Sequence, residues 1–182
     1  RVVPLVGDLA LPQLGLSPQA WASLAEHAAA IYHCGSLVHF GYPYAALRAA
    51  NVEGTIEVLR LAVEGAPKRI HYVSSLSVFG GGSNEVSEEE PLPPLSAVHG
   101  GYSQSKWVAE KLLALAAARG VPLTLYRPAR ITGHSVSGAC NTDDFLFRML
   151  KGCVQLGAYP PLRWLERAAP IDFVAAATVA VS

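Results

Sequence analysis

The chain has 182 residues, and because 51% of them are hydrophobic it can bury a core without disulfides or a structural metal. Acidic and basic residues both number 14, so the net charge is zero and nucleic acid is not expected as a partner. The three cysteines and six histidines lack the spacing of metal ligands, so we expect reduced thiols in the cytoplasm and no metal site. No apolar stretch reaches the roughly 18 residues that a membrane span needs, so we expect no membrane partner.

The first half of the chain alternates between short strands and helices. The apolar run at residues 2–6 predicts a strand, and Ser17 and Pro18 supply an N-cap and a first helical position. Residues 31–33 predict a second short strand. A long helical pattern follows over about residues 44–63, with apolar positions along one stripe.

The second half repeats this unit. Residues 69–73 are apolar at alternate positions and predict a strand, and after a loop rich in Gly, Ser and Pro a helix is expected from about Ser103 to Ala118. Residues 121–126 predict the next strand. The acidic run at residues 88–90 is interpreted as a solvated loop without chemistry.

Short strands that alternate with long helices, without hairpin turn signals, are typical of β-α-β units around a buried parallel sheet. We therefore expect the α/β class with a doubly wound, Rossmann-like sheet. The sequence opens without methionine and stops within a helical pattern, so we expect residues 1–182 to be the central part of one domain, truncated at both ends. Ligands bind such sheets at the carboxyl ends of the strands, and the loops there follow Val6, His33, Val73 and Tyr126.

One pair of residues on the predicted helix near residue 103 suggests acid/base chemistry. Tyr102 and Lys106 are four residues apart, which places the phenol and the ammonium on one helix face. A nearby positive charge favours the phenolate, so we expect Lys106 to lower the pKa of Tyr102 and prepare it for proton transfer. The alternative is an ordinary helix start with a tyrosine at its edge, and the spacing alone does not decide between them.

Two serines end the strand at residues 69–73. A hydroxyl of Ser74 or Ser75 would lie at the carboxyl edge of the sheet, where it could reach a substrate. Serines at strand ends also commonly bond the local backbone as turn formers, and in isolation that is the better interpretation.

The order and spacing of several segments add a resemblance to these local signals. The chain resembles the extended short-chain dehydrogenase/reductase family over nearly its whole length. The segments that carry the resemblance are residues 7–9, 33–36, 51–55, 71–80, 102–106 and 126–128.

The resemblance implies a role for each matching residue. Ser75, five residues before Gly80, would bond the substrate carbonyl, Tyr102 would be the acid/base, Lys106 would hold the nicotinamide ribose, and Asn51 would support proton relay. The implied cofactor-binding set is Asp8, Leu9, Cys34, Gly35, Ser74, Tyr102, Lys106, Pro128, Ala129 and Ile131. From the residues alone, Asp8 is better interpreted as a capping or turn aspartate and Asn51 as a buried polar helix residue.

Within that family the chain is most similar to the terminal thioester reductase domains of nonribosomal peptide and polyketide synthases, and to carboxylic acid and aminoadipate reductases. Residues 33–40, 44–55 and 131–145 carry this likeness. The stretch Asn141 to Asp144 is the most specific part, although an N-cap with an acidic first turn would also explain its composition.

The implied reaction is NADPH-dependent reductive release of an acyl or peptidyl chain from the phosphopantetheine of a carrier domain. The product would be an aldehyde, and a second reduction to the alcohol stays open. The glycine-rich β-α-β unit and the C-terminal substrate-binding part of the family are absent from these residues, so NADPH rests on the resemblance and the isolated fragment is expected to be inactive.

Two alternatives keep the same scaffold. An extended dehydrogenase or epimerase would act on a small ketone, an alcohol or a nucleotide sugar. A regulator that senses dinucleotides would need no catalysis, but the presence of Tyr102, Lys106 and Ser75 counts against it.

Overall fold

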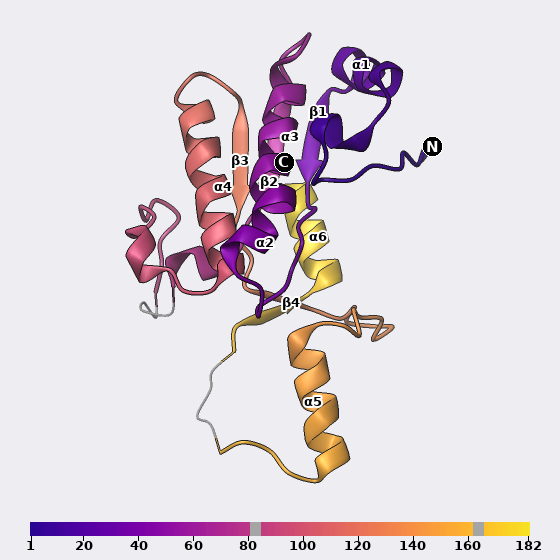
Figure 1. The fold of residues 1–182 in the computed structure, drawn as a ribbon. Coiled ribbons are helices and arrows are strands. Elements are labelled where there is room, and N and C mark those ends of the chain that lie inside the picture. The colour runs from indigo at the N-terminus through magenta and orange to yellow at the C-terminus, as the bar shows by residue number, and fades with distance from the viewer. Residues whose placement is uncertain (81–84, 162–165) are drawn as a thin grey trace. The chain divides into compact units, whose positions relative to one another are not determined.

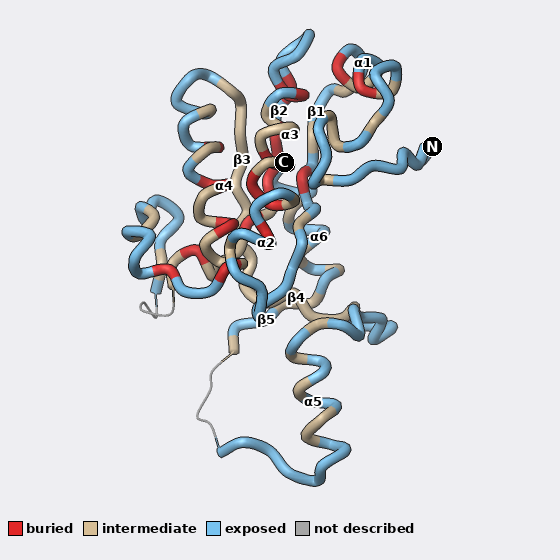
Figure 2. The backbone as a smooth tube through the Cα atoms, viewed as in Figure 1, coloured by how far each residue is buried: buried red, intermediate tan, exposed pale blue. Residues whose placement is uncertain are grey.

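A computed structural model describes residues 1–80, 85–161 and 166–182. The chain divides into two compact units, Arg1–Arg127 and Pro128–Ser182, and each is described by itself (Figure 1). The buried residues concentrate in the first unit, as Figure 2 shows.

The first unit is built on a parallel sheet of strands β1 (Ala30–His33), β2 (Arg69–Val73) and β3 (Leu123–Tyr126), with β2 in the middle. Ile70 pairs with Ile31 on one side and with Leu123 on the other. The expected α/β class with parallel strands is therefore confirmed. Because β2 is central, its carboxyl end lies between the carboxyl ends of β1 and β3.

Helices and short turns connect these strands. Helix α4 begins two residues earlier than the sequence pattern suggested, so Tyr102 lies in its first turn. The helical elements are η1 (Pro12–Gly15), α1 (Pro18–His27), α2 (Tyr44–Arg48), η2 (Ala49–Glu53), α3 (Gly54–Val63), η3 (Leu76–Phe79), η4 (Leu95–Ala97) and α4 (Gly101–Ala117).

The core lies between the sheet and helices α3 and α4. Ile70 and Tyr72 of β2 are 0% and 1% exposed, and they pack against α3 and α4 (Figure 1). Removing apolar side chains from water is the main driving force for folding, so this contact fixes α4 on the sheet. The members of the cluster are Val58, Ala62, Ile70, Tyr72, Ala109 and Leu113.

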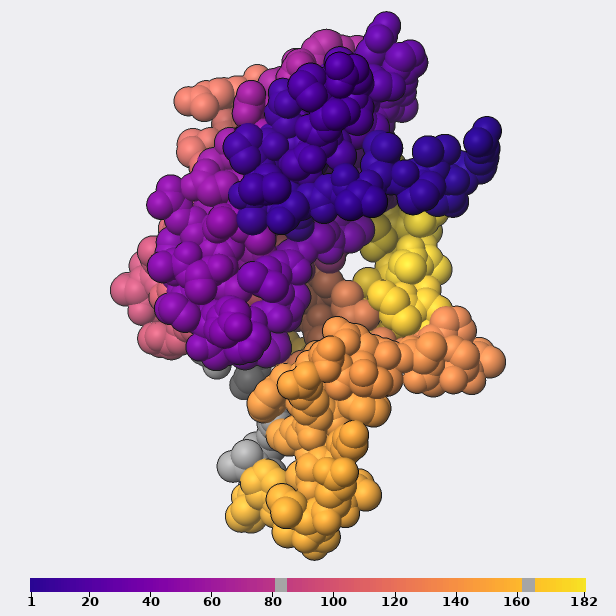
Figure 3. All heavy atoms as spheres, turned by 45° about the vertical axis from the view of Figure 1, so that its right-hand side comes forward, coloured from indigo at the N-terminus to yellow at the C-terminus, as the bar shows by residue number. Residues whose placement is uncertain are grey.

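Two predicted elements differ in the structure. The strand expected at residues 2–6 is wrong: these residues are exposed, and they form an arm along the surface in Figure 3. A strand needs a neighbour for its backbone hydrogen bonds, and the described residues offer none here. The long helix expected over residues 44–63 is interrupted by a π-helical turn, η2, which contains Asn51.

The second unit contains strands β4 (Arg130–Thr132) and β5 (Ala168–Pro170), which pair in parallel, and helices α5 (Phe145–Leu156) and α6 (Ile171–Ala180). None of its described residues is buried. Arg130 bonds Glu166 across the paired strands, with 2.8 Å between Nε and Oε1. No helix in the described part of the chain combines the length and the apolar character needed to cross a membrane.

Candidate active site

Lys106 lies buried where helix α4 meets the end of β2. Its Nζ donates a hydrogen bond to the carbonyl of Val73 at 2.7 Å and stands 4.1 Å from the centroid of the Tyr72 ring. Burial lowers the pKa of Lys106 from 10.5 to about 8, although the charge of Glu110 pulls it upward. The side chain therefore still carries its positive charge at neutral pH, at the last residue of β2.

Tyr102 is half-buried one turn before Lys106 on the same helix. Its ring meets the ring of Phe40 edge to face, with 5.6 Å between centroids, and its phenol shares a hydrogen bond with Ser36. Phe40 and Ser36 belong to the loop after β1. This loop and helix α4 therefore meet at the phenol.

The pKa of Tyr102 is shifted in the direction opposite to the expected one. Burial raises the pKa of Tyr102, and the hydrogen bond with Ser36 opposes that rise only in part. Lys106 does not reverse it, because its ammonium is directed to the Val73 carbonyl and to the Tyr72 ring. The phenol is therefore held in its protonated form at neutral pH.

Asn51 joins three segments of the site. Its side chain accepts a hydrogen bond from the Leu37 amide at 2.7 Å, and its amide group donates to the Leu37 carbonyl at 3.0 Å and to Ser105 Oγ at 2.9 Å. Ser105 in turn donates to the carbonyl of Tyr102 at 2.7 Å. Asn51 is 2% exposed, so its interpretation as a buried polar helix residue is confirmed, and its support of proton relay stays a prediction.

The π-helical turn at Asn51 has a visible cause. Thr55 Oγ1 donates to the carbonyl of Asn51 at 2.7 Å, and the Asn51 side chain is occupied with Leu37 and Ser105. Such single π-turns inside helices often mark functional positions. Here the turn brings the Asn51 amide to the loop after β1 and to helix α4.

His33 completes the buried polar cluster at the end of β1. It is 6% exposed, and its ring lies 5.3 Å from the ring of Tyr72. Burial, and then the charge of Lys106, lower the pKa of His33 from 6.5 to about 4. The imidazole is therefore neutral at physiological pH and adds no second positive charge next to Lys106.

The serines after β2 have distinct surroundings. Ser75 Oγ accepts a hydrogen bond from the Ser77 amide at 3.2 Å and caps η3, which is the local turn role weighed above. The Ser74 amide donates to the Tyr126 carbonyl at 2.7 Å. Among the described residues, the buried hydroxyls of Ser74 and Ser77 have no hydrogen-bond partner. A buried hydroxyl without a partner is costly, so it suits a group that bonds a ligand.

The residues expected to line the dinucleotide meet around Leu9. A Cβ on Gly35 would stand 2.9 Å from Leu9 Cδ1, and one on Gly54 would stand 2.7 Å from the Leu9 carbonyl oxygen. The loop at Asp8 and Leu9 thus packs against both the loop after β1 and helix α3. Asp8 itself is exposed and accepts a hydrogen bond from the Ala10 amide at 2.8 Å, as a turn aspartate does.

The remaining expected residues lie in the second unit. Pro128, Ala129 and Ile131 are half-buried around β4, and their place beside a nicotinamide stays a prediction. In the segment from Asn141 to Asp144, the side chain of Asp144 accepts from the Leu146 amide at 2.8 Å and caps helix α5. The capping explanation of that segment is confirmed for Asp144.

Sequence reasoning missed several residues that shape the site. Glu110 could have been found, because it follows Lys106 by four residues and so lies on the same helix face. Ser36, Tyr72, Ser105 and Arg127 lie inside the segments that carry the family resemblance, but no role was expected for them. Their contacts with Tyr102, Lys106, Asn51 and Glu110 join segments far apart in the sequence. No group of three or more possible metal-ligating side chains occurs among the residues that are described.

Comparison with known proteins adds a family match to this geometry. Residues 1–178 match the NAD-binding family model described as male sterility protein. One of the linear gramicidin synthase proteins of Brevibacillus parabrevis is 44% identical over 186 residues, covering 100% of this chain and 4% of that protein. The large subunit of L-2-aminoadipate reductase of Penicillium chrysogenum is 41% identical, and the alignment covers 100% of this chain and 14% of that protein.

A solved structure is similar in both sequence and fold. The terminal R domain from the myxalamid PKS-NRPS biosynthetic pathway matches with a TM-score of 0.94 and 51% identity, over 98% of this chain and 46% of that one. The chain thus spans less than half of the solved domain and a smaller share of both curated proteins.

Proposed function

Because the chain belongs to the NAD-binding family described as male sterility protein, within the extended short-chain dehydrogenases/reductases, we propose that it carries the acid/base site of an NADPH-dependent thioester reductase. One observation supports this most directly. Lys106 bonds the Val73 carbonyl at 2.7 Å, immediately before Ser74 and Ser75, and Tyr102 lies one turn away on the same helix.

Tyr102 acts as the proton donor in this proposal. Reduction of a thioester carbonyl places negative charge on oxygen, and a neutral phenol can donate to it. Burial raises the pKa of Tyr102, so at neutral pH the phenol has the proton that reduction requires.

Ser75 and Lys106 complete the site. Ser75 donates a second hydrogen bond to the same oxygen, for which its hydroxyl is free to turn because it now only accepts from the Ser77 amide. Lys106, with a pKa of about 8, supplies a positive charge that favours the developing oxyanion and binds the ribose hydroxyls. Asn51 holds the loop after β1 and helix α4 at the spacing that these groups need.

Several residues fit a nicotinamide dinucleotide. Cys34 is exposed, and the small side chains of residues 34–36 begin the loop at the carboxyl end of β1, where a dinucleotide would lie. The unpartnered Ser74 hydroxyl offers a further polar contact. Asp8, Leu9, Pro128, Ala129 and Ile131 would contribute the rest of the lining. When bound, the reduced cofactor supplies the hydride.

The substrate in this proposal is an acyl or peptidyl chain bound to the phosphopantetheine of a carrier domain. Hydride addition at the thioester carbonyl and protonation by Tyr102 give a hemithioacetal, which collapses to an aldehyde and the free thiol of the carrier. The similarity to a terminal R domain and to a gramicidin synthase protein supports a carrier domain as the partner. A reducing cytoplasmic compartment fits the three free thiols of the chain.

The test uses the intact protein, NADPH and an acyl thioester on its carrier domain. We expect NADPH oxidation together with release of an aldehyde that a hydrazine reagent can trap. A soluble ketone and a nucleotide sugar serve as comparison substrates. Efficient turnover of either one, with no turnover of the carrier-bound thioester, would overturn the proposal in favour of a small-molecule dehydrogenase or epimerase.

A further inference from the structure

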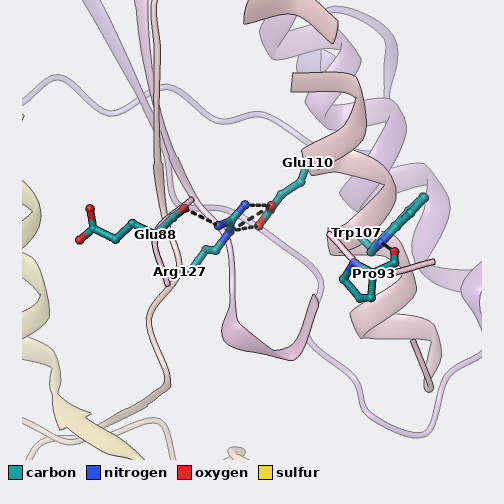
Figure 4. Close-up of polar contacts among 5 residues, drawn as sticks. All are labelled: Glu88, Pro93, Trp107, Glu110 and Arg127. Carbon is teal, nitrogen blue, oxygen red and sulfur yellow. Dashed lines mark hydrogen bonds and ion pairs between the residues drawn. The ribbon is translucent and has the colours of Figure 1, made fainter. Parts of the chain in front are cut away.

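A buried ion pair lies one turn beyond Lys106 on helix α4. The Arg127 guanidinium donates to the Glu110 carboxylate, with Nε at 3.2 and 3.1 Å from the two oxygens and Nη2 at 2.8 Å from Oε2 (Figure 4). The Glu110 side chain is 1% exposed and the Arg127 side chain 20%. Arg127 is the last residue of the first unit and follows strand β3 directly.

The same guanidinium also contacts the segment that follows Ser75. Its Nη1 donates to the Glu88 carbonyl at 3.5 Å (Figure 4). The guanidinium carbon of Arg127 also stands 5.1 Å from the centroid of the Phe79 ring. Phe79 ends η3, the turn that Ser75 caps. Arg127 thus links strand β3 and helix α4 to two points of the loop that begins at the site serines, at Phe79 and at Glu88.

Two further bonds attach this loop to helix α4. Trp107 Nε1 donates to the Pro93 carbonyl at 2.9 Å (Figure 4), and Gln104 Nε2 donates to the Val98 carbonyl at 3.1 Å. Both donors lie within the same two turns as Lys106. The loop is therefore bound to the helix that carries Tyr102 and Lys106 along much of its described length.

Glu110 also acts on Lys106 electrostatically. The two residues are four apart on α4, and both are buried, at 1% and 2% exposure. The charge of Glu110 raises the pKa of Lys106 against the effect of burial. Arg127 gives this buried carboxylate an ion-pair partner, with 2.8 Å between Nη2 and Oε2.

We infer that Glu110 and Arg127 form a positioning pair that fixes the segment after Ser75 against helix α4 and keeps Lys106 in its charged form. Neither residue touches the reacting atoms: Arg127 acts through the loop and Glu110 acts through Lys106. This inference rests on the proposed reductase function, in which Lys106 works as an ammonium.

The test is the pH dependence of kcat/KM in the intact protein carrying Glu110→Gln. Glutamine keeps the shape but removes the charge, so Lys106 loses its proton at lower pH. We expect the alkaline limb of the profile to move down by about one pH unit, the scale for one adjacent charge. The rates of the two proteins should converge toward pH 6.5 to within about twofold.

Three companions make this test decisive. The double variant Glu110→Gln/Arg127→Met removes both charges without leaving one unpaired. It should move the alkaline limb in the same direction but by less, because loss of the Arg127 charge partly offsets loss of the Glu110 charge. Glu53→Gln removes the carboxylate of the exposed Arg48–Glu53 pair and should leave the profile unchanged. The pH dependence of NADPH binding, followed by cofactor fluorescence, should move with the same limb.

The outcomes separate the pair from the overall function. If both charge-removing variants fold and keep the wild-type alkaline limb in both readouts, the positioning pair is refuted. If wild-type protein binds NADPH but reduces no thioester, the proposed function fails. The pH dependence of NADPH binding then still tests the inference on Glu110 and Arg127.

Discussion

The two units of this chain differ in how deeply their polar side chains are buried. In the first unit, Asn51, Ser105, Lys106 and Glu110 are all 2% exposed or less, and each has hydrogen-bond or ion-pair partners from distant segments. In the second unit no described residue is buried; the pair of Arg148 with Asp143 is exposed, and the pair of Arg130 with Glu166 is half-buried.

This difference indicates where the function resides. A buried polar group must be matched by partners because water cannot replace them, so each such group fixes the geometry of its neighbours. An exposed pair competes with water and contributes little. Substitutions in the first unit should therefore have large effects on activity or stability, and matched substitutions in the second unit should have small ones.

The largest effect is expected for Tyr102→Phe. Loss of the proton donor should lower kcat by at least about a hundredfold, equivalent to about 2.7 kcal/mol, with little change in NADPH affinity. Single-turnover reduction of a carrier-bound thioester measures it. Tyr159→Phe, which alters an 82% exposed tyrosine of the second unit, is the control and should keep the wild-type rate. A near wild-type rate for Tyr102→Phe would remove that residue from the mechanism.

The next effect is expected for Asn51→Ala. The change removes three hydrogen bonds, to the amide and carbonyl of Leu37 and to Ser105, from a 2% exposed position. We expect a loss of about 2 to 3 kcal/mol in the free energy of unfolding, measured by urea denaturation. The control Asn141→Ala removes one bond at the surface and should change stability by about 0.5 kcal/mol or less. Equal losses in both variants would contradict the contrast between the units.

His33 should make the first unit sensitive to acid. Its pKa is about 4 in the folded state and 6.5 in the unfolded state, so the unfolded chain binds more protons between these values. The free energy of unfolding should therefore fall by about 2 kcal/mol from pH 7 to pH 4.5 through this group. Urea denaturation over that range should show a shallower fall for His33→Phe than for wild type. Exposed His27→Phe is the control, and parallel curves for wild type and His33→Phe would disprove the prediction.

The smallest effect is expected in the second unit, for Asp172→Asn. The carboxylate accepts from the Ser135 amide at 2.9 Å and from Ser135 Oγ at 2.6 Å, and these bonds lower its pKa. Their contribution is present at neutral pH and is lost as the pH falls through the folded pKa. Because the pair is exposed, the variant should shift Tm at pH 7 by about 2 °C or less in a thermal scan. A larger shift would show that the second unit also depends on its polar pairs.

Local patterns were sufficient for most of the fold. Alternating apolar positions identified β2, and Ser17 with Pro18 identified the start of α1 correctly. The prediction failed at residues 2–6, where an apolar run does not supply the neighbour that a strand needs. It also failed within the long helix, where the side chain of Asn51 bonds Leu37 and Ser105 and a π-helical turn results.

The sequence by itself determined the α/β class, the family and the pairing of Tyr102 with Lys106, because helix periodicity and motif spacing are local properties of the chain. Only the tertiary structure decided the state of those groups. Burial, which depends on segments far apart in sequence, raises the pKa of Tyr102 and lowers the pKa of Lys106. The tertiary structure also brings Arg127 into contact with Glu110 and Ser36 into contact with Tyr102. The spacing of these residues in the sequence does not reveal either contact.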